Sequence, residues 1–209
     1  MHLKDLLEII KERRSVREFT NEKVSDEDIR LLIDAARYAP SNSNRQAWKF
    51  IILKNDKIKS EIADAVSEKI EKVKGNIKDE ELLKIFNDYT GYFLFFSQAP
   101  IVIFALYKTM PAVIEHVVSK IDAGTKAKKP DPELVSVSMA VQNLLLASHA
   151  MGLGACCITS PLIASTKIKK ILDIRPPFEI AALIPIGKYD KAPEVVGRKE
   201  VNKIIEIVE

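Results

Sequence analysis

The sequence predicts an α+β fold, in which four strand-like segments alternate with helical segments in one domain of 209 residues. Two of these segments, "WKFIIL" at 48–53 and "FEIAALIPIG" at 178–187, are short, apolar and rich in β-branched or aromatic residues, as strands are. No G-x-G-x-x-G sequence follows a strand and the P-loop sequence is absent, which argues against a dinucleotide-binding doubly wound fold.

The composition is that of a globular protein with balanced charge. Apolar residues make up 47% of the chain and charged residues 29%, so any disorder should be local. The net charge of +3 is spread along the sequence, which gives no case for nucleic acid as a partner. No apolar run approaches the roughly 20 residues that span a bilayer, so no membrane segment is expected.

Two further features favour a cytoplasmic location. The N-terminal "MHLKDLLEIIKERR" has no uninterrupted apolar stretch of the kind that a secretory signal needs. Cys156 and Cys157 are adjacent, and neighbouring cysteines are badly placed for a disulfide between themselves.

Amphipathic spacing predicts the elements of the first half. Apolar residues on one helical face predict a helix over 3–12 that runs into an arginine cluster. Ser25 and Asp28 form a capping-box-like start for a second helix, which Pro40 stops just after Tyr38. The strand at 48–53 is followed by helical patterns at 58–75 and 80–97 and by a buried strand in "APIVIFAL" at 99–106.

Between 107 and 133 the periodicity weakens, which predicts a mobile excursion that holds a short helix at 113–121. Pro132 then opens a long helix that Gly152 ends. Because this helix is apolar nearly all round, it must be buried on all sides, either in the middle of the domain or against a second copy of the chain.

The last part of the chain has three predicted elements and an arm. "ACCI" at 155–158 is predicted as a short strand, and Ser160 with Pro161 should begin a helix that runs to Leu172. The buried strand at 178–187 follows. The tail, residues 188–209, is predicted as a C-terminal arm in which "VNKIIEIVE" is a late strand or extended segment.

"RRSVREF" at 13–19 gathers Arg13, Arg14 and Arg17 around Ser15. If the first helix continues, Arg13 and Arg17 share a face and two guanidinium groups could bind a divalent anion. The alternative is an ordinary basic helix end that the helix dipole favours. The motif alone leaves both interpretations open.

"PSNSNRQAW" at 40–48 is too polar for the interior of an element. Its side chains could read the edge of a planar heterocycle, or they could simply form a polar surface loop. The residues that supply these donors and acceptors are Ser41, Asn42, Ser43, Asn44 and Gln46.

The remaining candidates are weak. Cys156 and Cys157 lie in an apolar run, where two small hydrophobic residues are the expected interpretation. His2, His116 and His149 have no paired spacing and no acidic or cysteine partners, so a zinc site is not expected.

In order and spacing, these fragments resemble the FMN-dependent nitroreductase family over nearly the whole chain. The fragments are "RRSVREF", "APSNSNRQAWKF", "MGLGACCI", and "IPIGKY" followed by "GRK". The resemblance implies a central, mostly antiparallel sheet flanked by helices, in an intertwined homodimer with two FMN sites at the subunit interface. The second subunit would cover the long apolar helix. Ala47 departs from the family, which usually has proline before the tryptophan.

The resemblance also implies a set of FMN contacts. Arg13, Arg14, Ser15 and Arg17 would contact the phosphate, the ribityl chain and the ring edge, joined at the phosphate by Arg198 and Lys199. The other subunit would contribute Pro40, Ser41, Asn42 and Asn44. Ile158, Thr159 and Ser160 match the segment in which a backbone N–H faces N5 of the flavin. The set also includes Gly187 and Gln46, and Arg13 and Gln46 would replace a lysine that some members carry at the pyrimidine edge.

The activity that the resemblance implies is oxidoreduction. NADH or NADPH would reduce the FMN and leave, and a nitroaromatic, quinone or similar electron-poor acceptor would then take the electrons in a ping-pong scheme. Flavin would carry the chemistry, so no catalytic side chain is expected. Relatives of the same fold include reductive dehalogenases and an oxygenase that consumes reduced flavin. A non-catalytic flavin-binding protein, or docking of an acidic partner on the arginines, is the other alternative.

Overall fold

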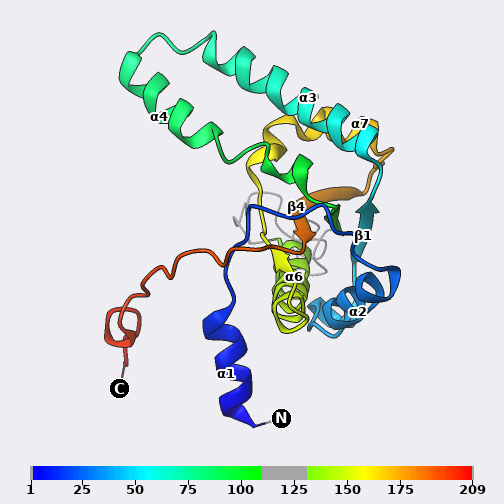
Figure 1. The fold of residues 1–209 in the computed structure, drawn as a ribbon, viewed down its shortest axis with the longest axis vertical. Coiled ribbons are helices and arrows are strands. Elements are labelled where there is room, and N and C mark those ends of the chain that lie inside the picture. Colours follow the sequence, from blue (N-terminus) through cyan, green and yellow to red (C-terminus); the bar gives the residue numbers. More distant parts are fainter. Residues whose placement is uncertain (1, 110–130, 209) are drawn as a thin grey trace, which may run out of the picture.

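The computed structural model describes residues 2–109 and 131–208 and has an α+β architecture, with helices on both sides of one sheet (Figure 1). The α-helices are α1 (Leu3–Glu12), α2 (Asp26–Arg37), α3 (Asp56–Lys74), α4 (Glu80–Thr90), α6 (Pro132–Ala150) and α7 (Ser165–Ile171). The strands are β1 (Trp48–Leu53), β2 (Ile101–Lys108), β3 (Gly154–Ala155) and β4 (Phe178–Gly187). The short 3₁₀ helices are η1 (Asn42–Asn44), η2 (Phe95–Gln98), η3 (Ser160–Ala164) and η4 (Val201–Lys203).

The sheet is antiparallel throughout the described residues, in the order β1-β2-β4-β3. β2 and β4 form its centre, and their register shifts between Ala105 and Leu106. The short β3 pairs Gly154 with Gly187 and Ala155 with Ile186, at the end of β4. The predicted α+β fold with an antiparallel sheet is therefore confirmed.

The hydrophobic core has two halves, one on each face of the sheet, because side chains along a strand alternate between faces. Ile103 and Ala105 of β2 point into the half that α2 and α6 cover. Val102 and Phe104 point into the other half, which α3, η2 and α7 cover. Strands covered on both faces are apolar along their length, which is why 101–106 and 178–187 were recognisable in the sequence.

Capping residues start the helices as expected. The Ser25 hydroxyl accepts a hydrogen bond from the Asp28 backbone N–H at 3.0 Å and opens α2. Pro132 lies in the first turn of α6, and the preceding Asp131 side chain accepts hydrogen bonds from the backbone N–H groups of Glu133 and Leu134. These interactions determine where the polypeptide enters α2 and α6.

Three predicted elements differ from the structure. The helix expected at 80–97 ends at Thr90, just before Gly91, and the chain resumes as the 3₁₀ helix η2. The expected strand 155–158 is reduced to Gly154–Ala155 and an isolated bridge between Ile158 and Leu183. The helix expected from Ser160 begins as 3₁₀ turns, with Thr159 rather than Ser160 at the cap position. The short helix predicted at 113–121 lies outside the described residues.

The long helix α6 is not buried on all sides within one chain. Val137, Ala140 and Leu144 are buried against the sheet. Leu134 is 38% exposed and Val135 is 49% exposed, and Ser138 and Gln142 are exposed as well, so an outward strip of the helix is uncovered and is apolar chiefly in its first turn. Within residues 2–109 and 131–208, the helix is therefore not covered on all sides, and its cover by a second copy of the chain stays a prediction.

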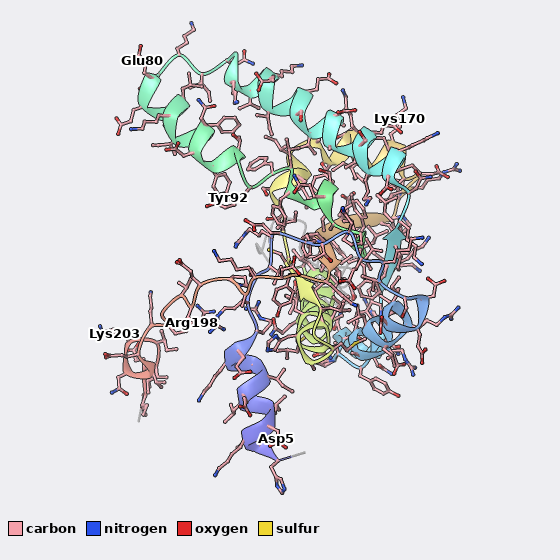
Figure 2. All side chains as sticks on the ribbon, viewed as in Figure 1. Asp5, Glu80, Tyr92, Lys170, Arg198 and Lys203 are labelled. Carbon is pink, nitrogen blue, oxygen red and sulfur yellow. The ribbon has the colours of Figure 1, made fainter. Side chains whose placement is uncertain are left out.

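Three parts of the chain project from this core (Figure 1). α1 and the arm after Gly187 extend away on one side, and the hairpin of α3 and α4 extends on the other. All side chains are shown in Figure 2, where Arg198 and Lys203 lie on the extended arm and Tyr92 follows the end of α4. Large apolar side chains are exposed on these parts, among them Leu3, Leu82, Ile85, Ile204 and Ile207. Nowhere in the described ranges is there a helix long and apolar enough to cross a membrane.

Candidate functional site

The arginine segment is extended rather than helical. α1 ends at Glu12, and Ser15 forms a parallel bridge with Ala155 of β3, in which the Val16 N–H donates to the Ala155 carbonyl at 3.1 Å. The first helix does not continue, so the condition under which Arg13 and Arg17 would share a helical face is not met. In an extended chain, side chains point alternately to opposite sides, so Arg13, Ser15 and Arg17 still share one side.

The surroundings of Cys156 show which side of the segment Arg13, Ser15 and Arg17 occupy. Burial raises the pKa of the Cys156 thiol, and this effect is partly opposed by the charge of Arg17, by a hydrogen bond with Ser15 and by the charge of Arg13. Arg13, Ser15 and Arg17 therefore all lie close enough to influence the pKa of the Cys156 thiol, next to β3. The net direction leaves the thiol neutral, so the geometry does not make Cys156 a nucleophile.

Arg14 lies on the opposite side and is held by its own neighbourhood. Its Nη1 atom donates to the carbonyl oxygens of Lys11 and Arg13, the latter at 2.9 Å. Its Nε atom is buried and has no hydrogen-bond partner in the described part of the chain. A buried donor of this kind costs free energy unless something accepts its hydrogen bond.

The segment 158–160 begins three residues after β3, the strand with which the arginine segment pairs. Ile158 exchanges backbone hydrogen bonds with Leu183 of β4 at 2.9 Å, while Thr159 is exposed at the start of η3. Gly187 pairs with Gly154, and a Cβ atom at Gly187 would lie 2.6 Å from Cδ of Pro100. Close packing against the Pro100 ring is therefore sufficient to require a glycine at position 187.

Arg198 and Lys199 lie on the exposed arm, away from the sheet (Figure 2). The Arg198 Nη1 atom donates only to the nearby carbonyl oxygens of Val196 and Gly197, at 3.3 and 3.4 Å. Within one chain, the structure records no hydrogen bond between these residues and the segment 13–17 in the described ranges.

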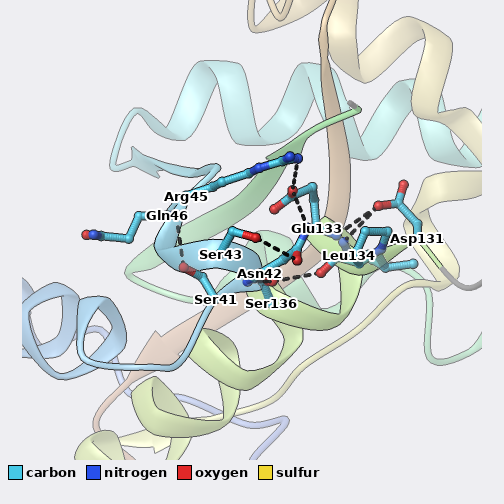
Figure 3. Close-up of polar contacts among 10 residues, drawn as sticks. Ser41, Asn42, Ser43, Arg45, Gln46, Asp131, Glu133, Leu134 and Ser136 are labelled. Atoms are coloured by element: carbon cyan, nitrogen blue, oxygen red, sulfur yellow. Dashed lines mark hydrogen bonds and ion pairs between the residues drawn. The ribbon is translucent and has the colours of Figure 1, made fainter. Parts of the chain in front are cut away.

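The polar loop 41–46 forms a compact turn against the first turns of α6 (Figure 3). The Asn42 backbone N–H donates to Ser136 Oγ at 3.1 Å, and the Gln46 N–H donates to Ser41 Oγ at 3.0 Å. Pro40, Asn44 and Gln46 are exposed, whereas Ser41 and Asn42 are half-buried. The loop therefore presents part of its polar surface to the outside.

These two groups of predicted site residues lie near opposite ends of α6. The loop contacts Ser136 near the helix start, and Leu153, which leads into β3, donates to Ser148 near the helix end. A helix of 19 residues is about 28 Å long. One chain therefore brings Arg13, Ser15 and Arg17 together with Ala155 and Cys156, whereas the loop lies near the other end of α6.

The arginine side chains of the segment 13–17 and of the C-terminal arm suit a phosphate ligand. None of Arg13, Arg14, Arg17 and Arg198 forms a salt bridge within residues 2–109 and 131–208. Guanidinium groups bind phosphate oxygens through charge-assisted hydrogen bonds. The donors present thus fit the phosphate end of the cofactor that the sequence resemblance implies. Within residues 2–109 and 131–208, no three His, Cys, Asp or Glu side chains are placed to hold a metal ion.

A model of the nitroreductase family matches residues 10–188, most of the chain, including both segments of this site and the polar loop. The chain belongs to the nitroreductase family. Among curated relatives in this family, the iodotyrosine deiodinase of Thermotoga neapolitana is 29% identical over 205 residues, which are 95% of this chain and 96% of that protein. The putative NAD(P)H nitroreductase YfhC of Bacillus subtilis is 24% identical over 200 residues, 94% of this chain and 91% of that protein.

Solved structures show the same nitroreductase fold. A BluB-like flavoprotein from Clostridium difficile 630 superimposes with a TM-score of 0.88 at 27% identity, over 100% of both chains. An iodotyrosine deiodinase bound to FMN and 3-iodo-L-tyrosine gives a TM-score of 0.72 at 24% identity, over 94% of this chain and 96% of that one.

One feature of this nitroreductase-family site was missed from the sequence: Glu133, which contacts Asn42 and Arg45 of the loop. In the sequence it looks like an ordinary acidic residue in the first turn of a helix, which the helix dipole favours anywhere on the surface. No sequence signal separated it from a solvated glutamate, since its burial depends on the loop that folds over it.

Proposed function

We propose that the chain is a homodimeric FMN-dependent oxidoreductase, which uses NADH or NADPH to reduce nitroaromatic, quinone or similarly electron-poor acceptors. The observation that carries this proposal is the group of Arg13, Ser15 and Arg17 on one side of an extended segment, next to residues 155–156, in a chain of the nitroreductase family. Support for the cofactor and the donor comes from the FMN named in a neighbouring structure and the NAD(P)H named for a relative.

When bound, FMN supplies the redox chemistry by accepting a hydride and passing electrons to the acceptor. The task of the chain is to bind and orient it. Arg17 and Arg13 would hold the phosphate end and the ring edge, with Arg198 joining them from the arm. Arg14, which lies on the opposite side of the segment with its Nε atom buried, is the member of the predicted set that this arrangement supports least.

The positions of the arginine segment and the loop support the proposed homodimer. The loop of one chain cannot join the arginine segment of the same chain around one flavin, since they lie near opposite ends of α6. A second chain packed on the outward strip of α6 would supply the loop. The exposed apolar residues of α6 and the projecting arm support this arrangement.

The test is a visible spectrum of the purified protein, followed by anaerobic titration with NADH and with NADPH. We expect a yellow protein whose flavin absorbance bleaches with at least one nucleotide and returns on addition of a nitroaromatic or quinone. A colourless protein that also fails to bind added FMN would contradict the proposal. Bound flavin that no nucleotide reduces would point to the non-catalytic alternative.

A second candidate is reductive dehalogenation, which the identity to an iodotyrosine deiodinase favours. Such a reaction replaces a carbon–halogen bond with a carbon–hydrogen bond, consumes two electrons and a proton, and releases halide. The test compares two rates for the reduced protein: iodide release from 3-iodo-L-tyrosine, and oxidation of the reduced protein by nitroaromatics. If iodide release is faster, dehalogenation rather than nitroaromatic reduction is the activity.

A further inference from the structure

The strongest unexplained feature of the molecule is a buried carboxylate beneath the polar loop. The Glu133 side chain is 0% exposed, and its Oε1 atom accepts hydrogen bonds from Nδ2 of Asn42 at 3.3 Å and from Nη1 of Arg45 at 3.2 Å (Figure 3). Both donors come from the loop, whereas Glu133 belongs to α6. One oxygen atom thus connects the loop to the helix at two points.

Burying this carboxylate is costly unless its charge is well compensated. Its position in the first turn of α6 helps, since the helix dipole favours a negative charge there. Oε2, however, is buried with no hydrogen-bond donor in the described residues. A buried ion pair with incomplete hydrogen bonding is weak evidence for a purely stabilising role.

The loop needs an external constraint because its backbone is strained. Ser43, Asn44 and Gln46 have φ angles of 50°, 52° and 48°, which place three non-glycine residues in the left-handed region. Such conformations are unfavourable for residues other than glycine and persist only where surrounding contacts enforce them. Among the described residues, the hydrogen bonds that join the loop 41–46 to another element are those of Asn42 with Glu133 and Ser136 and of Arg45 with Glu133.

We propose that Glu133 is a positioning residue, which holds the loop 41–46 in the conformation that binds the ligand. In this arrangement the side chains of Asn42 and Arg45 point inward to Glu133 and fix the conformation of the loop. The outward Asn44 and Gln46 remain available to a ligand. The inference deepens the proposed function, on which it rests for the identity of that ligand as a flavin.

The loop itself can be followed without any flavin. Trypsin cleaves after arginine, so the rate of cleavage between Arg45 and Gln46 in flavin-free protein reports release of the loop, and mass spectrometry identifies the fragment. For Glu133→Gln we expect this rate to rise about tenfold or more, in line with the loss of a hydrogen bond to a charged group. The matched control is Glu68→Gln, which breaks the exposed pair with Lys167 far from the loop and should leave the rate unchanged.

Flavin binding gives the second readout. If the loop contacts the ring and ribityl chain, Glu133→Gln should weaken FMN and riboflavin binding alike, by about tenfold, without altering the phosphate contacts. Should Glu133→Gln fail to fold, Asn42→Ala removes one donor of the same contact while leaving the buried carboxylate, and a smaller rise in Arg45 cleavage is expected.

The outcomes separate the two proposals. Rapid Arg45 cleavage in Glu133→Gln, together with a wild-type protein that binds no flavin, would support the positioning role and contradict the proposed cofactor. Wild-type flavin binding with cleavage rates and affinities of Glu133→Gln equal to those of wild type would overturn the positioning role and leave the cofactor standing.

Discussion

The ammonium group of Lys59 lies 2.6 Å from the carbonyl oxygen of Ala99 and donates a hydrogen bond to it across the interior of the protein. Lys59 is 4% exposed and also reaches the Pro100 carbonyl and the Asp56 carboxylate. A lysine on α3 thereby fixes the turn that leads from η2 into β2. This contact belongs to the fold rather than to the proposed flavin site.

Replacing Lys59 by methionine should destabilise the protein, because the buried Ala99 carbonyl would lose its charged donor. We expect the free energy of unfolding to fall by about 1–3 kcal/mol, measured by urea denaturation. Asp56→Asn is the control: that carboxylate is exposed, so little change is expected. Equal losses for both variants would show that the carboxylate, not the carbonyl contact, matters.

Arg17→Ala should weaken FMN binding much more than riboflavin binding, because only FMN carries the phosphate. Loss of one charge-assisted contact corresponds to about 1.5–3 kcal/mol, roughly tenfold or more in the dissociation constant. Fluorescence titration with both ligands measures the difference. Arg37→Ala on α2, where the arginine pairs with Asp34, serves as the control and should bind both ligands normally. A matching loss for both ligands would place Arg17 elsewhere on the flavin.

Val135→Glu should convert the proposed dimer into a monomer that no longer retains FMN. Val135 lies on the outward strip of α6 and is 49% exposed in the single chain, so a charge there should leave the protomer folded. Light scattering after size-exclusion chromatography would show the mass of one chain in place of two. Ser60→Glu, on the exposed side of α3, should remain dimeric. A monomeric wild-type protein would dismiss the dimer directly.

Stability should fall at alkaline pH partly because of Cys156. Burial raises the pKa of this thiol in the folded protein. The contribution is therefore fully present below the ordinary thiol pKa and is lost as pH rises towards the raised one, since only the unfolded chain then ionises readily. Urea midpoints of wild type and Cys156→Ala, compared across this range, should show a steeper decline for wild type. Parallel curves would mean that the thiol ionises normally in the folded protein.

The sequence contained enough information for most of the fold because local signals coincided with the tertiary structure. Ser25 caps α2, Pro132 opens α6, and the central strands are apolar on both faces. The conformation of 13–17 was not predictable in this way. Its extended form depends on pairing between Ser15 and Ala155, which are 140 positions apart, and a basic helix end was equally compatible with the local sequence.

The candidate site, like the fold, could be predicted from the sequence only in part. The motifs identified the arginine segment and the polar loop, since their donors are unusual for a helix end and a turn. The resemblance implied that the two groups act from different subunits, but no sequence signal indicated the role of Glu133, because its burial depends on how the loop packs on α6. Gly187 is the opposite case: it was assigned to the cofactor, and the nearby Pro100 ring explains it without one.

The placement of the arginine segment and the loop near opposite ends of α6 has a consequence for complementation between defective variants. In the proposed dimer, each flavin would draw its phosphate contacts from one chain and its loop from the other. A chain with a defective arginine segment and a chain with a defective loop would each be inactive alone. Mixed together, they would form heterodimers in which one site carries both defects and the other carries neither. Two inactive proteins should thus restore one another's activity, as no pair of defects confined to the same motif can do.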